Sequence, residues 1–183
     1  PDGKLVFLIH GWDSNIGSLT LFAKGLMETN NYRIIGVSLP AHGYHDEKRT
    51  NMVESGEAFK TVLNFINQKE RFDVIAHSFG AGVTTMGLAT STYKADKIVF
   101  LTTPNKVKNI FDEFKNFVKM GDKAYSNMLE IAKNEIINEP IEEYTIAKKL
   151  LKADYNDLLI IHDEYDKILP FSNSEEIVEM HPW

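Results

Sequence analysis

Five short apolar runs are spaced along this chain, with segments of helical periodicity between most of them. Each run is continuously apolar rather than alternating, which is typical of parallel strands covered on both faces. Segments 16–29 and 57–68 carry apolar residues at the spacing of an amphipathic helix. This pattern predicts an α/β fold, a mostly parallel twisted sheet with helices on both faces. The five predicted strands are 4–9, 33–38, 72–76, 97–101 and 157–161.

One interval breaks this alternation. Between Pro104 and about Ala153 there is no strand signal, only amphipathic helical segments. About fifty residues is long for a single crossover, so we expect a helical lid inserted over the carboxyl edge of the sheet. Ordinary crossover helices are the alternative. The helical segments expected in this interval are 107–120, 125–137 and 141–152.

The insertion defines the expected domain organisation. Residues 1–103 form the first part of the core, 104–153 the lid, and 154–183 the second part of the core. The lid is rich in aromatic residues on its first helical segment. We expect these aromatics to pack within the lid rather than to form a substrate wall; they are Phe111, Phe114 and Phe117.

The composition bounds the class of protein. The chain has 183 residues, 43% hydrophobic and 25% charged, which suits one globular domain with a sizeable core. Its formal net charge of −6 disfavours nucleic acid or an anionic membrane as partner, because both would repel it. No apolar run approaches the roughly 18 residues needed to span a bilayer.

The absence of cysteine narrows the chemistry further. It rules out disulfides, thiolate catalysis and cysteine-based zinc sites. It also fits a reducing compartment, so we predict a cytoplasmic location. Neither glycine-rich nucleotide motif, G-x-G-x-x-G or G-x-x-x-x-G-K, occurs. We therefore expect no metal and no cofactor, while the oligomeric state stays open.

Ser78 lies at a corner between two predicted elements. The strand before it is apolar, and the helix after it is rich in small residues, so its side chain is pushed out to the rim of the sheet. The small residues Ala76, Gly80 and Gly82 let strand, turn and helix approach closely. A serine hydroxyl is a poor nucleophile unless a base and an oxyanion site converge on it. Ser78 is therefore a candidate nucleophile, provided that the chain supplies a base and an oxyanion site beside it.

Two further stretches follow predicted strands, and the carboxyl ends of parallel strands meet at one edge of the sheet. After the first strand, Gly11 allows a sharp turn that frees the amide of Trp12 to point into a cleft. The amide of Phe79 begins the helix after Ser78 and points the same way. These two amides form a predicted oxyanion hole. Acidic residues lie just past the end of the last predicted strand; they are Asp163, Glu164 and Asp166.

Together these motifs resemble the α/β-hydrolase superfamily, in particular its lidded serine esterases and lipases. The match covers essentially the whole chain, in the family order. His-Gly-Trp at 10–12 resembles the oxyanion loop, and Pro-Ala-His-Gly at 40–43 resembles the family's P-G-H-G loop. Ala-His-Ser-Phe-Gly at 76–80 resembles the nucleophile elbow G-x-S-x-G, with Ala76 in place of the first glycine.

The acid of the implied triad comes from the last loop. Residues 162–170, His-Asp-Glu-Tyr-Asp-Lys-Ile-Leu-Pro, resemble a family segment whose second acid belongs to the catalytic triad. The resemblance therefore assigns this role to Asp166. Asp163 is the alternative, because it lies closer to the strand end.

A triad also needs a histidine base, which the family order places after the acid. His181 follows Asp166, but the stretch between them must hold a loop and a helix and leaves no room for a final strand. We interpret His181 as a helix terminator and expect the base beyond Trp183, in a chain truncated at both ends. The remaining histidines are expected to support or border the loops; they are His10, His42, His45, His77 and His162.

The function implied by the resemblance is hydrolysis of a small ester, thioester or amide through an acyl-enzyme. The partner is then a small-molecule acyl substrate. Two alternatives stay open at this point. One is a non-catalytic ligand-binding protein with the same fold; the other is a cofactor-free relative that cleaves carbon–carbon bonds or performs an oxidation.

Overall fold

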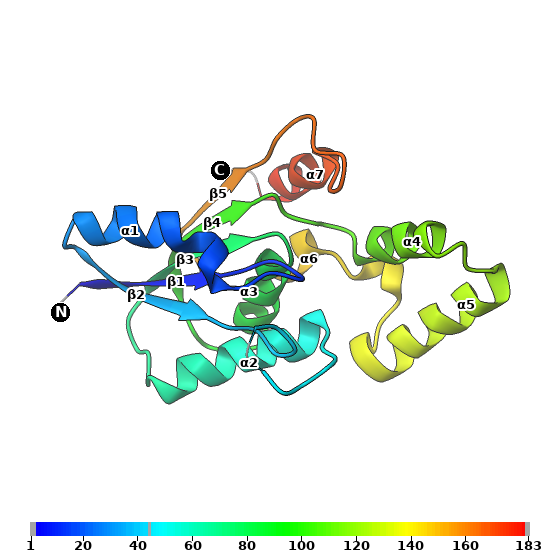
Figure 1. The fold of residues 1–183 in the computed structure, drawn as a ribbon, viewed down its shortest axis with the longest axis horizontal. Helices are drawn as coiled ribbons and strands as arrows, with labels where there is room; N and C mark the ends of the chain where they lie inside the picture. Colours follow the sequence, from blue (N-terminus) through cyan, green and yellow to red (C-terminus); the bar gives the residue numbers. More distant parts are fainter. Residues whose placement is uncertain (1–2, 44, 182–183) are drawn as a thin grey trace.

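The computed structural model describes residues 3–43 and 45–181, and this part of the chain forms one five-stranded sheet (Figure 1). The strands lie in the order β2-β1-β3-β4-β5, and every neighbouring pair is parallel. The predicted α/β class is confirmed. The strands are β1 Lys4–Ile9, β2 Tyr32–Val37, β3 Phe72–His77, β4 Ala95–Leu101 and β5 Asp157–Ile161. The chain is predicted to be truncated at both ends, but its first two and last two residues lie outside the described residues.

The strand order contains a reversal at β1. Strand β2 pairs with one side of β1 and β3 with the other, so the chain changes its winding direction between them. Ligands of open α/β sheets bind outside the carboxyl ends of the strands at such a point. The register pairs Ile9 with Ala76 and His77 with Leu101, so β1, β3 and β4 end side by side. Trp12 and Ser78 both follow these ends.

Helices cover both faces of the sheet, as predicted. On one face, Phe7, Phe59 and Phe72 meet edge to face, with ring centroids 5.0–6.4 Å apart, at the centre of the larger core cluster. The smaller cluster, around Val6 and Leu8, lies under α1. The helices that contribute to the larger cluster are α2 Met52–Phe65, α3 Phe79–Ala89, α6 Ile146–Leu150 and α7 Ser172–Met180, whereas η1 Ile16–Leu19 and α1 Thr20–Glu28 cover the other face.

The expectation that every strand is covered on both faces is wrong for the edge strand β5. Leu158 is buried against the larger cluster, but Leu159 is 55% exposed and Ile161 is 53% exposed. The helix α1 packs against β2 at the opposite edge. Within the described residues, the outer face of β5 therefore has no helix over it.

Two helices begin where a side chain caps their first turn rather than where the apolar pattern begins. The Oδ1 atom of Asn51 accepts a hydrogen bond from the amide of Glu54, at 2.9 Å, and α2 therefore starts five residues earlier than expected. The Oγ1 atom of Thr145 accepts from the amide of Lys148, at 3.1 Å, and starts α6. The segment before Thr145 forms a separate 3₁₀ turn, η3 Ile141–Glu143.

The interval 104–153 contains two kinds of helix. Figure 1 shows α4 (Val107–Phe117) and α5 (Asp122–Ile131) projecting away from the sheet. Helix α5 continues into the π-helical segment η2, Ala132–Ile137. Neither α4 nor α5 has a buried residue, whereas α6 packs into the core beside α3. Among the described helices, none has the length and apolar character to cross a membrane.

Candidate active site

Ser78 occupies a strained corner between β3 and α3. Its φ of 50° and ψ of −115° lie in a region that residues with a Cβ rarely adopt. The amide of Ser78 donates to the carbonyl of Leu101, at 2.9 Å, and fixes the corner to β4. Gly80 permits the fold here, because a Cβ on it would lie 2.5 Å from the carbonyl oxygen of Ile9. Within the described residues, the Ser78 hydroxyl has no hydrogen-bond partner.

The loop after β1 passes directly beside this corner. A Cβ on Gly11 would lie 2.8 Å from Nδ1 of His77, so a larger residue here would have to displace the His77 ring. The rings of Trp12 and Phe79 pack edge to face, with centroids 5.0 Å apart. Among the described residues, neither the Trp12 amide nor the Phe79 amide donates to a protein acceptor. Both are therefore free to donate to a ligand.

A reciprocal pair of histidines ties the loop after β1 to the loop after β2. The Nε2 atom of buried His10 accepts from the amide of Leu39, at 3.2 Å, and its Nδ1 lies 2.8 Å from the Gly11 carbonyl. In return, Nε2 of His42 accepts from the amide of Asp13, at 3.1 Å. Burial lowers the pKa of His10. Both rings accept a hydrogen bond at Nε2, and they hold the turn that carries Trp12.

The two candidate acids in the loop after β5 differ in burial and in hydrogen bonding. Asp163 is exposed and only accepts from the amide of Tyr165, at 2.9 Å. Asp166 is half-buried, and its Oδ1 accepts from the amides of Ile168 and Leu169, at 2.8 and 2.9 Å. The hydrogen bond from Leu169 is the largest cause that holds the pKa of Asp166 below its ordinary value. Asp166 is thus a fixed carboxylate, whereas Asp163 caps a surface turn.

His162 orders this acid loop. Its side chain is almost fully buried, its Nδ1 lies 2.6 Å from the Ser174 hydroxyl and its Nε2 lies 2.8 Å from the Leu169 carbonyl. Nε2 also lies 3.7 Å from Oδ2 of Asp166. Both ring nitrogens of His162 are therefore occupied in holding the loop.

Of the remaining histidines, His181 is held away from Ser78. His181 lies near Tyr155, which precedes β5, and therefore at the opposite end of the sheet; its ring nitrogens contact the Tyr155 hydroxyl and the Ala147 carbonyl, at 2.8 and 2.9 Å. His45 lies 3.4 Å from a carboxylate oxygen of Glu47. Burial lowers the pKa of His77, although the charge of Asp166 opposes this shift. Among the described residues, no group of three or more His, Asp or Glu side chains is arranged to hold a metal ion.

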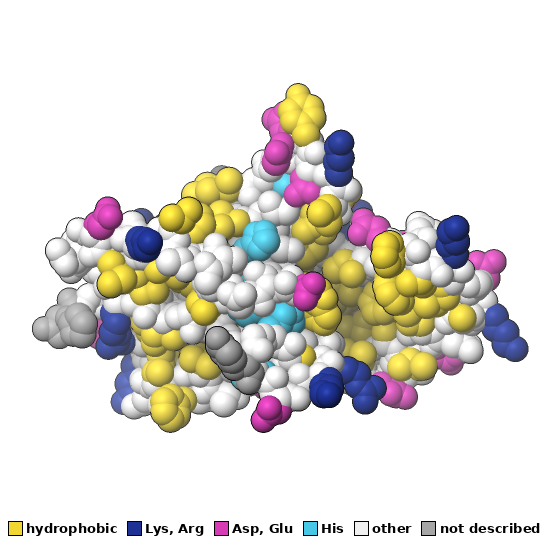
Figure 2. Space-filling view, in the orientation of Figure 1, with side chains coloured by type: hydrophobic (Ala, Val, Ile, Leu, Met, Phe, Trp, Pro, Cys, Tyr) yellow, Lys and Arg dark blue, Asp and Glu magenta, His cyan; other side chains and the backbone are white. Residues whose placement is uncertain are grey.

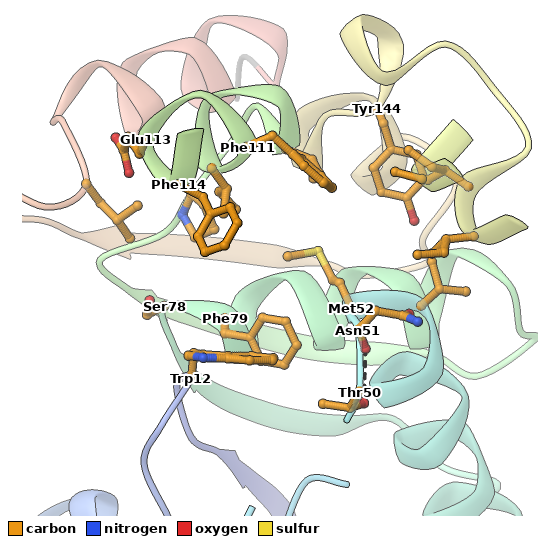
Figure 3. A pocket seen from close by; sticks show the side chains of 18 of the residues that line it. Trp12, Thr50, Asn51, Met52, Ser78, Phe79, Phe111, Glu113, Phe114 and Tyr144 are labelled. Atoms are coloured by element: carbon orange, nitrogen blue, oxygen red, sulfur yellow. Dashed lines mark hydrogen bonds between the residues drawn. The ribbon is translucent and has the colours of Figure 1, made fainter. Parts of the chain in front are cut away.

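A cavity of about 620 Å³ opens beside Ser78, between the sheet and the projecting helices (Figure 3). We call Trp12, residues 50–53 and Ser78–Phe79 its floor, and residues 104–137 its roof. Figure 2 shows apolar side chains gathered in the hollow between these two parts. The lining residues outside floor and roof are Tyr144, Ile168 and Leu169.

The roof corrects the expectation for the aromatic residues of the interval. Phe111 and Phe114 line the cavity instead of packing only within the helices. Phe117 is 86% exposed and is not among the residues that line this cavity. The floor residues 50–53 were not expected at the site either. The Asn51 cap, three residues before Glu54, is the sequence signal that could have placed them at a helix start.

No family model matches the chain. It is similar to one curated protein and to many solved structures. The human protein named serine hydrolase-like protein 2 is 22% identical over 155 residues, which are 83% of this chain and 48% of that protein. The chain thus spans about half the length of the curated relative that it matches.

Solved structures match over nearly the whole chain. An extracellular α/β-hydrolase from a Paenibacillus species superposes with a TM-score of 0.67 at 16% identity, over 95% of this chain and 86% of its own. An enzyme described as degrading N-acyl homoserine lactones superposes with a TM-score of 0.73 at 14% identity, over 99% of this chain and 82% of its own. The resemblance drawn from the motifs is confirmed at the level of architecture, and the chain has the α/β-hydrolase fold.

Proposed function

We propose that this protein is a serine hydrolase that cleaves an ester, thioester or amide through an acyl-enzyme. The observation that carries the proposal is the backbone of Ser78, which holds an unpartnered hydroxyl at a strained strand–helix corner beside a cavity. Strain of this kind persists only where the surrounding structure enforces it. The resemblance to a curated serine hydrolase-like protein supports the same reading.

The chemistry assigns a role to each group of the corner. The Ser78 oxygen attacks the carbonyl carbon, and its proton passes to a base. The amides of Trp12 and Phe79 donate to the oxyanion that forms. Collapse of this intermediate expels the alcohol, thiol or amine, which takes the proton from the base. Water, activated by the same base, then hydrolyses the acyl-enzyme and restores Ser78.

The base in this proposal is a histidine oriented by Asp166, contributed from beyond Trp183. The support is that His10, His162 and His181 already use both ring nitrogens in the contacts described above. The same holds for His42, whose Nδ1 lies 2.8 Å from the Pro40 carbonyl. Asp166 is preferred over Asp163 because two backbone amides fix its carboxylate in the ionised form.

We further propose that α4, α5 and η2 act as the lid. They supply most of the cavity's roof, and they project from the sheet without a buried residue in α4 or α5. Helix α6 belongs to the same interval but packs into the core, so the lid is confined to the helices before it. The cytoplasmic location predicted from the absence of cysteine is part of the same proposal.

The test is labelling of the full-length protein with a fluorophosphonate probe. We expect Ser78→Ala to abolish labelling, whereas Ser91→Ala, just beyond the C-terminal end of the same helix, leaves it unchanged. Asp166→Asn should slow labelling by roughly a thousandfold or more, as loss of an orienting carboxylate does in a triad, and Asp163→Asn should not. Equal labelling of the Ser78→Ala variant and the parent would refute the nucleophile assignment.

A non-catalytic ligand-binding protein is the second candidate. Two observations favour it: four described histidines are engaged in structural contacts, and the cavity is large and mostly apolar. The two candidates differ in one result. A binding protein would take up apolar ligands without being labelled at Ser78.

A further inference from the structure

The cavity beside Ser78 offers a ligand almost no free polar group. Most of its lining is aliphatic, aromatic or methionine side chains. Apart from the Ser78 hydroxyl, the hydroxyl and amide side chains in the floor are already engaged: Thr50 pairs with the Ser55 hydroxyl, at 3.0 Å, and Asn51 caps α2. Each of these bonds would have to break before the group could bind a substrate, which costs free energy.

Tyr144 closes the end of the cavity away from Ser78 (Figure 3). Its hydroxyl lies 2.8 Å from Sδ of Met86 in α3. Burial raises the pKa of Tyr144 to about 12, so the side chain is neutral throughout the ordinary pH range. The ammonium of Lys149 lies over its ring, 4.4 Å from the centroid. With its polar end occupied in the core, Tyr144 presents an aromatic wall to the cavity.

The only charge along the lining belongs to Glu113, which lies with Phe114 at the Ser78 end (Figure 3). No lysine or arginine is among the lining residues, all of which lie in the described part of the chain. A carboxylate on the ligand would therefore meet no cation, would lose its hydration and would be repelled by Glu113. The lining disfavours anionic ligands.

From these observations we propose that the site takes a neutral ester or thioester with an extended apolar chain, which lies between Ser78 and Tyr144. The proposal rests on the hydrolase function proposed above and adds the substrate class. The chain fills the space between Trp12, Phe79 and Met52 in the floor and Phe111 and Phe114 in the roof. Chain length is limited by the wall that Tyr144 forms.

If the proposal is right, the affinity for a ligand should rise steadily with the length of its apolar chain. Each methylene moved from water into an apolar cavity favours binding by about 0.8 kcal/mol, or about fourfold in affinity. The slope should continue until the chain reaches Tyr144 and then flatten. A cavity lined by polar groups would give no such series.

The first experiment measures binding without catalysis. Straight-chain 2-alkanones of increasing length are titrated by calorimetry into the full-length Ser78→Ala variant. We expect the dissociation constant to fall by about two- to fourfold per methylene over the shorter members. A ketone that carries a terminal carboxylate should bind at least tenfold more weakly, because this carboxylate would lose its hydration against the apolar lining and meet no cation there. Affinity independent of chain length would overturn the proposal.

A matched pair of substitutions locates the bound chain. Phe111 lines the cavity and Phe117, on the same helix, is exposed and does not. Phe111→Ala should weaken binding of the longest ketones by about tenfold, and Phe117→Ala should not change it. Ala132→Leu adds volume to the roof instead of removing it and should shift the preference to shorter chains, which covers the case in which Phe111→Ala does not fold. Equal effects of Phe111→Ala and Phe117→Ala would contradict the placement.

The second experiment identifies which side of the ester carries the chain. Nitrophenyl esters of varied acyl length and acetate esters of varied alcohol length are hydrolysed by the full-length protein, and the series whose kcat/KM rises with length names the side. If the ketone series binds as expected but Ser78 is not labelled and neither ester is cleaved, the hydrolase function fails and the apolar cavity stands. If Ser78 is labelled but neither series depends on length, the substrate class fails and the hydrolase function stands.

Discussion

The sheet side of the cavity and its roof are built in opposite ways. Beneath the floor, Phe7, Phe59 and Phe72 are fully buried, and Gly80 lies against the end of β1. In the roof, α4 and α5 contain no buried residue, and Phe117 is 86% exposed. Because regions with few buried apolar contacts open at low cost, the roof should move while the Ser78 corner stays fixed. The proposed nucleophile and the proposed lid thus lie in parts of the molecule that differ in burial.

The largest expected difference between the two regions concerns matched phenylalanines. Phe59→Ala empties a fully buried position and should lower the free energy of unfolding by about 3–5 kcal/mol. Phe117→Ala removes an exposed ring and should change it by less than about 0.5 kcal/mol. Urea unfolding followed by circular dichroism measures both. Similar losses in the two variants would show that the roof is packed as tightly as the sheet.

Matched glycines give the next largest difference. A Cβ on Gly80 would lie 2.5 Å from a backbone oxygen of β1, so Gly80→Ala must shift the Ser78 corner and should cost about 2–3 kcal/mol. Gly121, between α4 and α5, has no neighbour within 4 Å of such a Cβ, and Gly121→Ala should change stability by less than about 0.5 kcal/mol. Thermal unfolding of both variants tests this. A tolerated Gly80→Ala would mean that the corner is not rigid.

The sheet side was also the part that could be predicted from the sequence. Continuous apolar runs are sufficient to place parallel strands, and the bounds of β1 and β5 match the expected 4–9 and 157–161. The corner at Ser78 was predictable because strand, serine and small residues are adjacent in the chain. The structure places Trp12 and Phe79 together at this corner, with their rings 5.0 Å apart.

The roof could not be predicted in the same way. The periodicity of α4 is helical whether its apolar face meets another helix or a cavity, so Phe111 and Phe114 were expected to pack internally. Which of the two occurs depends on how far the helices stand from the sheet, and no local pattern records that distance. The open face of β5 was missed for a similar reason. An apolar run indicates a strand, but coverage of its two faces depends on elements elsewhere in the chain.

Lowering the pH should destabilise the sheet side but not the roof, and this effect should be smaller than those of the substitutions above. Burial lowers the pKa values of His10 and His77 on the sheet side below the ordinary value of 6.5. As the pH falls below 6.5, the unfolded chain binds protons that the folded chain does not, so the free energy of unfolding decreases, by at most about 1.4 kcal/mol per pH unit for each histidine. In the roof, hydrogen bonds from Lys108 and Tyr125 lower the pKa of Asp112 below its ordinary 3.8. That contribution is complete above pH 3.8 and is lost only below it.

Between pH 6.5 and 5, therefore, the sheet should weaken while the local stability of the roof stays constant. Native-state hydrogen exchange, corrected for the intrinsic pH dependence of amide exchange, measures both regions in one sample. We expect protection of β1 and β3 to decrease with acid and that of α4 to remain low and unchanged, because α4 exchanges through local opening. His10→Gln keeps an acceptor for the Leu39 amide without a titrating ring, and it should reduce the slope for β1. If α4 lost protection in parallel with β1, the two regions would open as one unit, and the roof could not serve as an independently moving wall.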